Sequence, residues 1–129
     1  MSGVFARNRK PTPFDPIDIG AELQDKLSKF IGNEKYVPKK WRFLIGTRVL
    51  DKVDEMMDIA IEANSVNTRS HPELKSKRTE LWYKAKAKCS QLDRRIARLI
   101  NVCPQADAGD MTEIIKLLDK EDEALSRAH

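Results

Sequence analysis

The sequence predicts an all-α fold, an antiparallel up-down bundle of four helices that forms an oligomer. Apolar residues recur at intervals of three and four in four segments, which is the period of a helix buried on one face. Only 5 of the 129 residues are glycine and 6 are proline, while 34% are charged and 40% hydrophobic. This composition favours helices over sheets, and the short links between the segments favour helices that alternate in direction. We assign residues 16–129 to this bundle.

The first fifteen residues are predicted to be a flexible basic arm. Closely spaced prolines, Pro11 and Pro13, prevent regular structure there. The basic residues of the arm are Arg7, Arg9 and Lys10. Such an arm could contact phosphate or act only as a solubilising tail, and we favour the tail.

The first two helices are expected to run from Pro16 to about Gly32 and from Pro38 to about Asn64. Apolar residues cover well over half the circumference of the second helix, more than a helix at the edge of a bundle requires. We predict that partner helices cover one of its stripes and a second subunit covers the other. The alternative is a central helix enclosed within one bundle. The predicted oligomer interface comprises Phe43, Leu50, Met57 and Ile61.

Three residues inside the second helix have separate interpretations. Gly46 is a lone glycine, which we expect to permit close helix packing at some cost in helix propensity. Arg48 and Lys52 interrupt the broad apolar face. We favour a structural role for both, with Arg48 paired to Asp51 or to an acid of the last helix. The alternative is that they line a surface or channel that nucleic acid reaches.

The third helix is predicted from Pro72 to about Cys103, with Ser70 and Glu73 as a capping box. It holds the positive excess of the chain: residues 72–101 contain nine basic and three acidic residues, a net charge of +6, whereas the whole chain is +4. Two aromatic residues interrupt the basic series. Trp82 points toward the apolar side and is expected to pack, whereas Tyr83 points away and could pack or stack on a base.

Five basic residues of this helix project along one narrow line, about a quarter-turn from its apolar stripe. This basic strip comprises Lys77, Lys84, Lys88, Arg95 and Arg98. Charges in a row, one or two helical turns apart, suit the phosphates of a nucleic-acid backbone. The N-terminal turn of the second helix is expected to support the contact through Lys39, Lys40 and Arg42. The alternative is a solvated face whose charges are balanced elsewhere in the chain.

The fourth helix, from Asp110 to about Arg127, favours that alternative most strongly. Residues 110–129 contain six acidic and three basic residues, a net charge of −3. An acidic helix beside a basic one suggests internal pairing. Exposed pairs contribute little each, however, and do not account for a helix of +6.

No catalytic constellation is present in the sequence, and we expect neither enzymatic activity nor a cofactor or metal. It lacks a glycine-rich phosphate loop, a CxxC or HExxH spacing and a serine in an elbow context. Cys89 and Cys103 fall at apolar positions of one helix and are predicted to be buried, reduced thiols. No run of residues is apolar enough to span a membrane, so we predict a soluble, cytoplasmic protein.

Residues 37–50 contain the motif of a known family, a Pro-Lys-Lys-aromatic-Arg-Phe start followed by Gly-x-Arg and a hydrophobic run. Here it reads VPKKWRFLIGTRVL. The segment resembles the small four-helix-bundle proteins related to those encoded in bacterial ribosomal intervening sequences. Within that group it looks most like the accessory variability determinant proteins of diversity-generating retroelements. The resemblance extends over residues 37–100, and elsewhere only the order of helices agrees.

The resemblance implies a specific function. Such accessory proteins form homopentamers with a basic surface, bind RNA or DNA, and act with an error-prone reverse transcriptase without catalytic activity of their own. We therefore expect a non-catalytic nucleic-acid-binding accessory protein that partners a retroelement reverse transcriptase in mutagenic retrohoming. The alternative is a protein-interaction adaptor that binds no nucleic acid.

Overall fold

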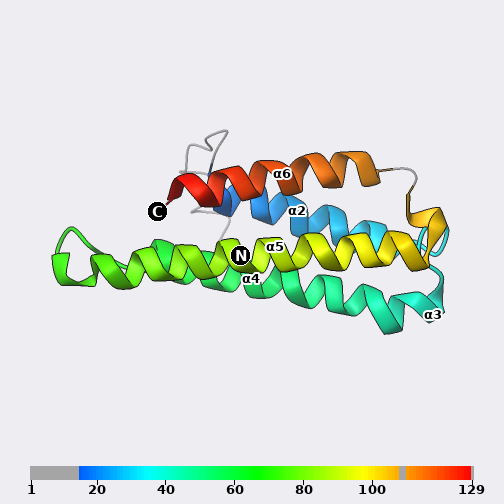
Figure 1. Ribbon diagram of the computed structural model, residues 1–129, viewed down its shortest axis with the longest axis horizontal. Helices are drawn as coiled ribbons and strands as arrows, with labels where there is room; N and C mark the ends of the chain where they lie inside the picture. Colours follow the sequence, from blue (N-terminus) through cyan, green and yellow to red (C-terminus); the bar gives the residue numbers. More distant parts are fainter. Residues whose placement is uncertain (1–14, 108–109, 129) are drawn as a thin grey trace.

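A computed structural model describes residues 15–107 and 110–128, and in this part of the chain all regular structure is helical (Figure 1). Its four long helices are α2 (Pro16–Ile31), α4 (Thr47–Ser65), α5 (Lys75–Val102) and α6 (Met111–Ala128). The predicted all-α, four-helix fold is confirmed. The predicted arm lies outside the described residues except for Asp15.

Each long helix packs against two neighbours, which closes the bundle around one core. α4 contacts α5 and α2, and α6 contacts α2 and α5. In Figure 1, α4 and α5 lie side by side and project beyond α2 and α6 at the end that holds residues 66–74. All four helices supply side chains to the core, including Leu23, Leu27, Met56, Leu92, Ile96, Ile114 and Leu125.

Local contacts at both ends explain where α2 begins and stops. The carboxylate of Asp15 accepts hydrogen bonds from the backbone N–H of Ile17 at 2.8 Å and of Asp18 at 3.4 Å. These bonds satisfy two of the N–H groups that a helix start leaves without a partner. Gly32 follows the last helical residue, as predicted.

The second predicted helix contains an unpredicted wide turn. It consists of α3 (Lys39–Trp41), the π-helical turn η1 (Arg42–Gly46) and α4, with no break between them. Gly46 ends the wide turn, and a Cβ built there would lie 2.7 Å from Cγ2 of Ile31. Gly46 therefore permits the close helix packing that the sequence predicted, and the structure shows that the neighbour is the end of α2.

The third predicted helix starts differently from the expectation. A 3₁₀ turn, η2 (Pro72–Leu74), precedes α5, and no side chain caps either start. The capping-box prediction is wrong because Asn67 organises this loop instead. Its carboxamide oxygen accepts the backbone N–H of Arg69 and of Ser70, each at 3.1 Å. A second 3₁₀ turn, η3 (Pro104–Ala106), follows α5.

The core of α5 agrees with the sequence prediction. Trp82 is buried, and Cys89 and Cys103 are buried free thiols. Burial, with the nearby charge of Glu121 as the next contribution, raises the pKa of Cys89 to about 12. Cys103 Sγ donates to the carbonyl oxygen of Tyr36 at 3.1 Å. Both thiols are therefore structural parts of the bundle.

Candidate nucleic-acid interface

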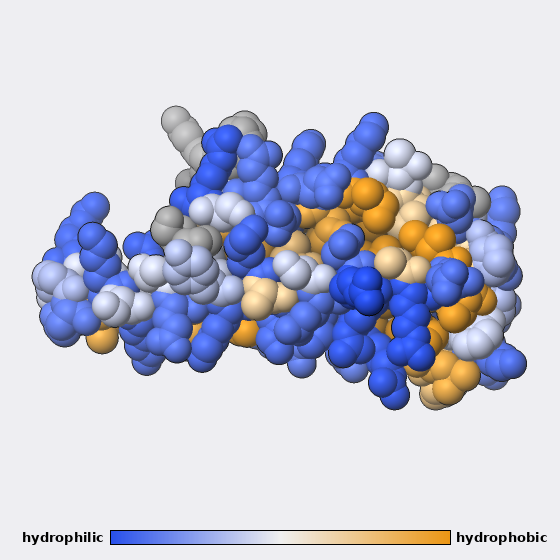
Figure 2. Space-filling view, viewed as in Figure 1, coloured by the Kyte–Doolittle hydropathy of each residue, from blue (hydrophilic) through white to orange (hydrophobic). Residues whose placement is uncertain are grey.

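The basic strip follows α5 along its boundary with α4. Lys77, Lys84 and Arg98 are exposed, whereas Lys88 and Arg95 are half-buried. Buried residues of the same helix fix the direction of the strip, because they anchor the adjacent face of α5 in the core. They are Leu81, Ala85, Cys89, Leu92, Ile96 and Leu99. Most of the face seen in Figure 2 is hydrophilic, and apolar residues gather in the half nearest α3.

Carboxylates neutralise the basic strip only in part. Lys84 lies 3.8 Å from Glu80 of its own helix, and Lys88 lies 3.7 Å from Glu55 of α4. Within the described residues, Lys77, Arg95 and Arg98 have no ion pair. Exposed pairs of this kind contribute at most about 1 kcal/mol and weaken with salt, so a polyanion can displace them.

The acidic helix α6 pairs with only one basic residue of α5 within the described part of the chain. Lys86 donates to Oδ1 of Asp122 at 3.1 Å and to Oγ of Ser126 at 2.5 Å. Lys86 lies outside the basic strip. The internal pairing that α6 suggested therefore exists, but it leaves the strip unaffected.

A polar network joins α4 to the middle of the strip. Lys52 is only 8% exposed, donates to Oε1 of Gln91 at 2.9 Å and pairs with Glu55 at 2.8 Å. The hydrogen bond from Lys52 lowers the pKa of Glu55, and the charges of Lys52, Lys88 and Arg95 lower it further. Glu55 is therefore a fixed negative charge already shared by several cations, and the predicted structural role fits Lys52.

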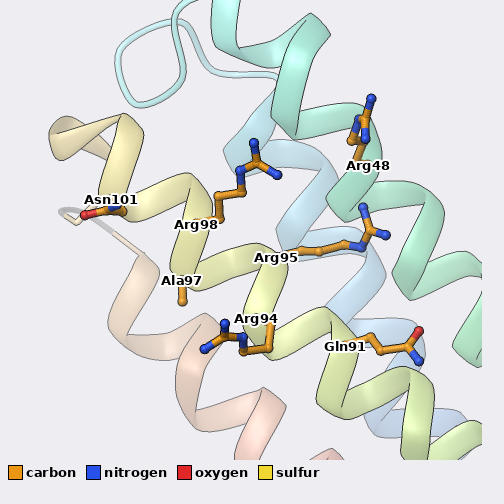
Figure 3. Close-up of a pocket in the computed structure, with 7 residues that line it drawn as sticks. All are labelled: Arg48, Gln91, Arg94, Arg95, Ala97, Arg98 and Asn101. Atoms are coloured by element: carbon orange, nitrogen blue, oxygen red, sulfur yellow. The ribbon is translucent and has the colours of Figure 1, made fainter.

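Four arginines surround a shallow depression of about 780 Å³ near the C-terminal end of α5. Figure 3 shows Arg48 extending from α4 and Arg95 extending toward it from α5. Arg94 and Arg98 complete the arginines, with Gln91, Ala97 and Asn101 as the other lining residues. No carboxylate of the described residues lines this hollow, which we call the arginine depression.

Arg48 does not make the predicted ion pair. No carboxylate in residues 15–107 and 110–128 lies within 4.0 Å of its guanidinium, and the side chain is exposed. For the acids of the last helix the reason is that α4 packs mainly against α5 and α2. Asp51, three residues along α4, also lies beyond 4.0 Å from the guanidinium. Arg94 was not among the predicted site residues, although three arginines within residues 94–98 are a signal of local charge.

The supporting residues of the second helix have other contacts as well. Arg42 donates from Nε to the carbonyl oxygen of Ile31 at 3.1 Å and from Nη2 to that of Val37 at 3.4 Å. It therefore holds the end of α2 and the following loop, which makes it a structural residue. Lys40 lies 5.1 Å from the ring centre of Trp41, and Lys39 is exposed.

The four predicted interface residues do not share one environment. Phe43 is 72% exposed, Ile61 is also exposed and Leu50 is half-buried. Met57 is only 3% exposed and lies against Gly20 of α2. Met57 is thus a core residue, because α2 covers part of the stripe that the sequence analysis gave to a second subunit. Tyr83 is exposed beside the basic strip.

No group of three histidine, cysteine or acidic side chains within residues 15–107 and 110–128 has an arrangement that could hold a metal ion. None of the helices in this part of the chain combines the length and the apolar character of a membrane span.

The fold and this surface define an all-helical bundle with a basic strip and an arginine depression on one long helix. Comparison of the chain with models of protein families, with curated proteins and with solved structures found no match. The resemblance to the accessory variability determinant proteins therefore stays a prediction.

Proposed function

We propose that this protein is a non-catalytic accessory protein that binds the backbone of RNA or DNA along its basic strip. The observation that carries the proposal is the lack of covering carboxylates. Lys77, Arg95 and Arg98 have no ion pair within the described residues, and the strip lies at the surface. A row of cations that carboxylates neutralise only in part attracts a polyanion by long-range electrostatics and releases its counterions on contact.

The finer features of the proposal concern topology and partners. Two contacts between α4 and α5 support an antiparallel up-down bundle. Lys52 of α4 contacts Gln91 of α5, and Glu55, one turn further along α4, contacts Lys88, which lies earlier on α5. The resemblance in residues 37–50 supports a homopentamer that partners a retroelement reverse transcriptase. The exposed side chains of Phe43 and Ile61 are surfaces on which a second subunit could pack.

A matched pair of variants tests nucleic-acid binding. The triple variant K77Q/K84Q/R98Q removes three exposed charges of the strip, whereas K29Q/K116Q/K120Q removes three exposed charges from α2 and α6. Fluorescence anisotropy with a labelled duplex, measured across salt concentrations, gives the slope of log affinity against log salt. Each lost phosphate contact on duplex DNA makes that negative slope less steep by about 0.9. We therefore expect the magnitude of the slope to fall by about 2–3 in the strip variant.

The control variant sets the condition for rejection. It has the same net charge as the strip variant, so a general charge effect would weaken both proteins equally. We expect the control to retain most of its affinity and slope. Equal losses in the two variants, or no loss in the strip variant, would refute the assignment of the basic strip.

One observation favours a second candidate function, a protein-interaction adaptor. Phe43 and Leu44 are 72% and 52% exposed at the start of the second helix. Exposed apolar side chains that lie together offer a surface on which a protein partner can pack. A gel shift at modest salt, with and without a candidate retroelement reverse transcriptase, separates the two functions. A shift that requires the enzyme supports the adaptor, and a shift with the protein alone supports direct binding.

A further inference from the structure

The arginine depression differs in kind from the rest of the basic strip. The lysines of the strip follow α5 in a row, whereas the four arginines that line the depression come from two helices. In Figure 3, Arg95 extends toward α4 near Arg48, and Arg94 extends from the other side of α5 toward α6. Two of them, Arg48 and Arg94, are not strip residues. Like charges that share one hollow repel one another, and this repulsion falls when an anion of high charge density binds.

The surroundings do not relieve this repulsion. No carboxylate of the described residues lines the hollow. On α4, Glu55 pairs with Lys52 and Lys88, and Asp51, one helical turn from Arg48, lies beyond 4.0 Å from its guanidinium. Arg94 also borders a smaller hollow lined by three carboxylates, Asp93, Asp119 and Asp122, but none of them lies within 4.0 Å of its guanidinium. The positive charge of the depression therefore remains available to a ligand.

The donor groups of the depression suit linked phosphates. A guanidinium is planar and can donate two parallel hydrogen bonds to one phosphate, which a lysine cannot do. The carboxamide oxygen of Gln91 is occupied by Lys52 at 2.9 Å, which leaves the amide N–H₂ of Gln91 to donate. Asn101 contributes a second carboxamide to the lining. The lining thus offers many donors in a small region.

The size of the depression restricts the ligand. A volume of about 780 Å³ lies within the range of about 300–1,000 Å³ that is usual for small-molecule sites. A chain of two or three phosphates with one nucleoside fits within this volume. Only Ala97 among the lining residues is apolar, so charge rather than shape provides the selectivity.

We propose that the arginine depression binds a terminal oligophosphate, two or three linked phosphates at the 5′ end of a nucleic acid or of a free nucleotide. For nucleic-acid ends the proposal rests on the proposed function, because the strip then holds the adjoining backbone. For a free nucleotide it is independent of that function. The double variant R48Q/R94Q separates the two sites, since it leaves every residue of the basic strip intact.

The first measurement is calorimetric titration of the purified protein with inorganic tripolyphosphate, with orthophosphate and with a nucleoside triphosphate. We expect tripolyphosphate to bind at least tenfold more tightly than orthophosphate, and R48Q/R94Q to lose at least tenfold of that affinity. K77Q/K84Q, which changes only the distant lysines, should keep it. Absence of tripolyphosphate binding, or binding that R48Q/R94Q retains, would overturn the proposal whatever the result with nucleic acid. Circular dichroism melting of each variant establishes that it is folded.

The second measurement distinguishes the two sources of the oligophosphate. Anisotropy compares one single-stranded RNA sequence with a 5′-triphosphate and with a 5′-hydroxyl. Tighter binding of the triphosphate form, lost in R48Q/R94Q, assigns the depression to nucleic-acid ends. Equal binding of the two RNAs, together with nucleoside triphosphate binding in the titration, assigns it to free nucleotides. If neither RNA binds, the proposed function fails while the tripolyphosphate titration still decides the present proposal.

Discussion

The side chain of Glu121 provides the sharpest test of the energetics of this bundle. Glu121 lies on α6 and is 0% exposed, and neither of its carboxylate oxygens has a hydrogen-bond partner within the described residues. It faces α2, where a Cβ added at Gly20 would overlap it. Burial, with a smaller contribution from the charge of Asp15, raises the pKa of Glu121 from 4.5 to about 8. The protein therefore keeps a neutral carboxylic acid in its core at neutral pH.

The sign of the pH dependence follows from this shift. The unfolded chain releases the Glu121 proton near pH 4.5, whereas the folded chain keeps it until about pH 8. The free energy of unfolding from this group is therefore highest below pH 4.5 and falls between pH 4.5 and 8. The slope is about 1.4 kcal/mol per pH unit. The loss is about 3 kcal/mol at pH 7 and about 5 kcal/mol above pH 8, as orders of magnitude.

The substitution Glu121→Gln removes this dependence, because a carboxamide resembles the neutral acid in shape and does not ionise. We expect the variant and the parent to have similar stability at pH 4.5. The variant should be more stable at pH 7, by about 3 kcal/mol, and more so at pH 9. Urea unfolding followed by circular dichroism at the three pH values measures this difference. Asp119→Asn, at an exposed position of α6, is the control.

Two outcomes would refute the reasoning. A stability difference that does not grow with pH would mean that the pKa of Glu121 is not raised in the folded protein. A less stable variant at pH 7 would mean that the carboxylate is ionised and has a partner that the amide cannot replace. Parallel changes in the Asp119 control would trace the pH dependence to the general charge of α6 instead of to Glu121.

Two other substitutions test the packing of the helices. Gly20→Ala places a Cβ onto Sδ of Met57. We expect thermal unfolding to show a loss of stability of about 1–3 kcal/mol, despite the better helix propensity of alanine. An unchanged or higher melting temperature would contradict the packing. Arg42→Ala removes the donor to the carbonyl oxygen of Ile31. We expect urea unfolding to show that the free energy of unfolding falls by about 1–3 kcal/mol. Nucleic-acid affinity should change less than twofold. A large loss of affinity with unchanged stability would return Arg42 to the interface.

The sequence predicted the helices well because their ends carry local signals. Pro16 and Gly32 bound α2, and Cys103 follows the last residue of α5. The wide turn at Arg42–Gly46 has no comparable signal, since it depends on how α2 approaches the chain near Gly46. The position of Glu121 did have a signal. It lies three and four residues from buried Leu117, Leu118, Ala124 and Leu125, so helical periodicity placed this acid on the apolar side.

The sequence predicted the part of the candidate site that lies on a single helix and missed the part that depends on how two helices pack. The basic strip depends on the spacing of residues along α5, so it could be read from the sequence. The arginine depression depends on the register between α4 and α5, which brings Arg48 beside Arg95 across the sequence (Figure 3). Met57 shows the same limit, because only the position of α2 decides whether that stripe of α4 is core or surface.

The order of lysines and arginines along α5 supports two modes of binding on one helix. All five lysines of residues 72–101 precede Ser90, and three of the four arginines follow it. The lysine half includes the part of α5 that projects with α4 beyond the other helices, where mobile ammonium groups can follow a backbone (Figure 1). The arginine half lies in the body of the bundle, where planar guanidinium groups can each donate two parallel hydrogen bonds to a phosphate. Removing the lysines should therefore change the salt slope, and removing Arg48 and Arg94 should change the preference for a terminal phosphate chain.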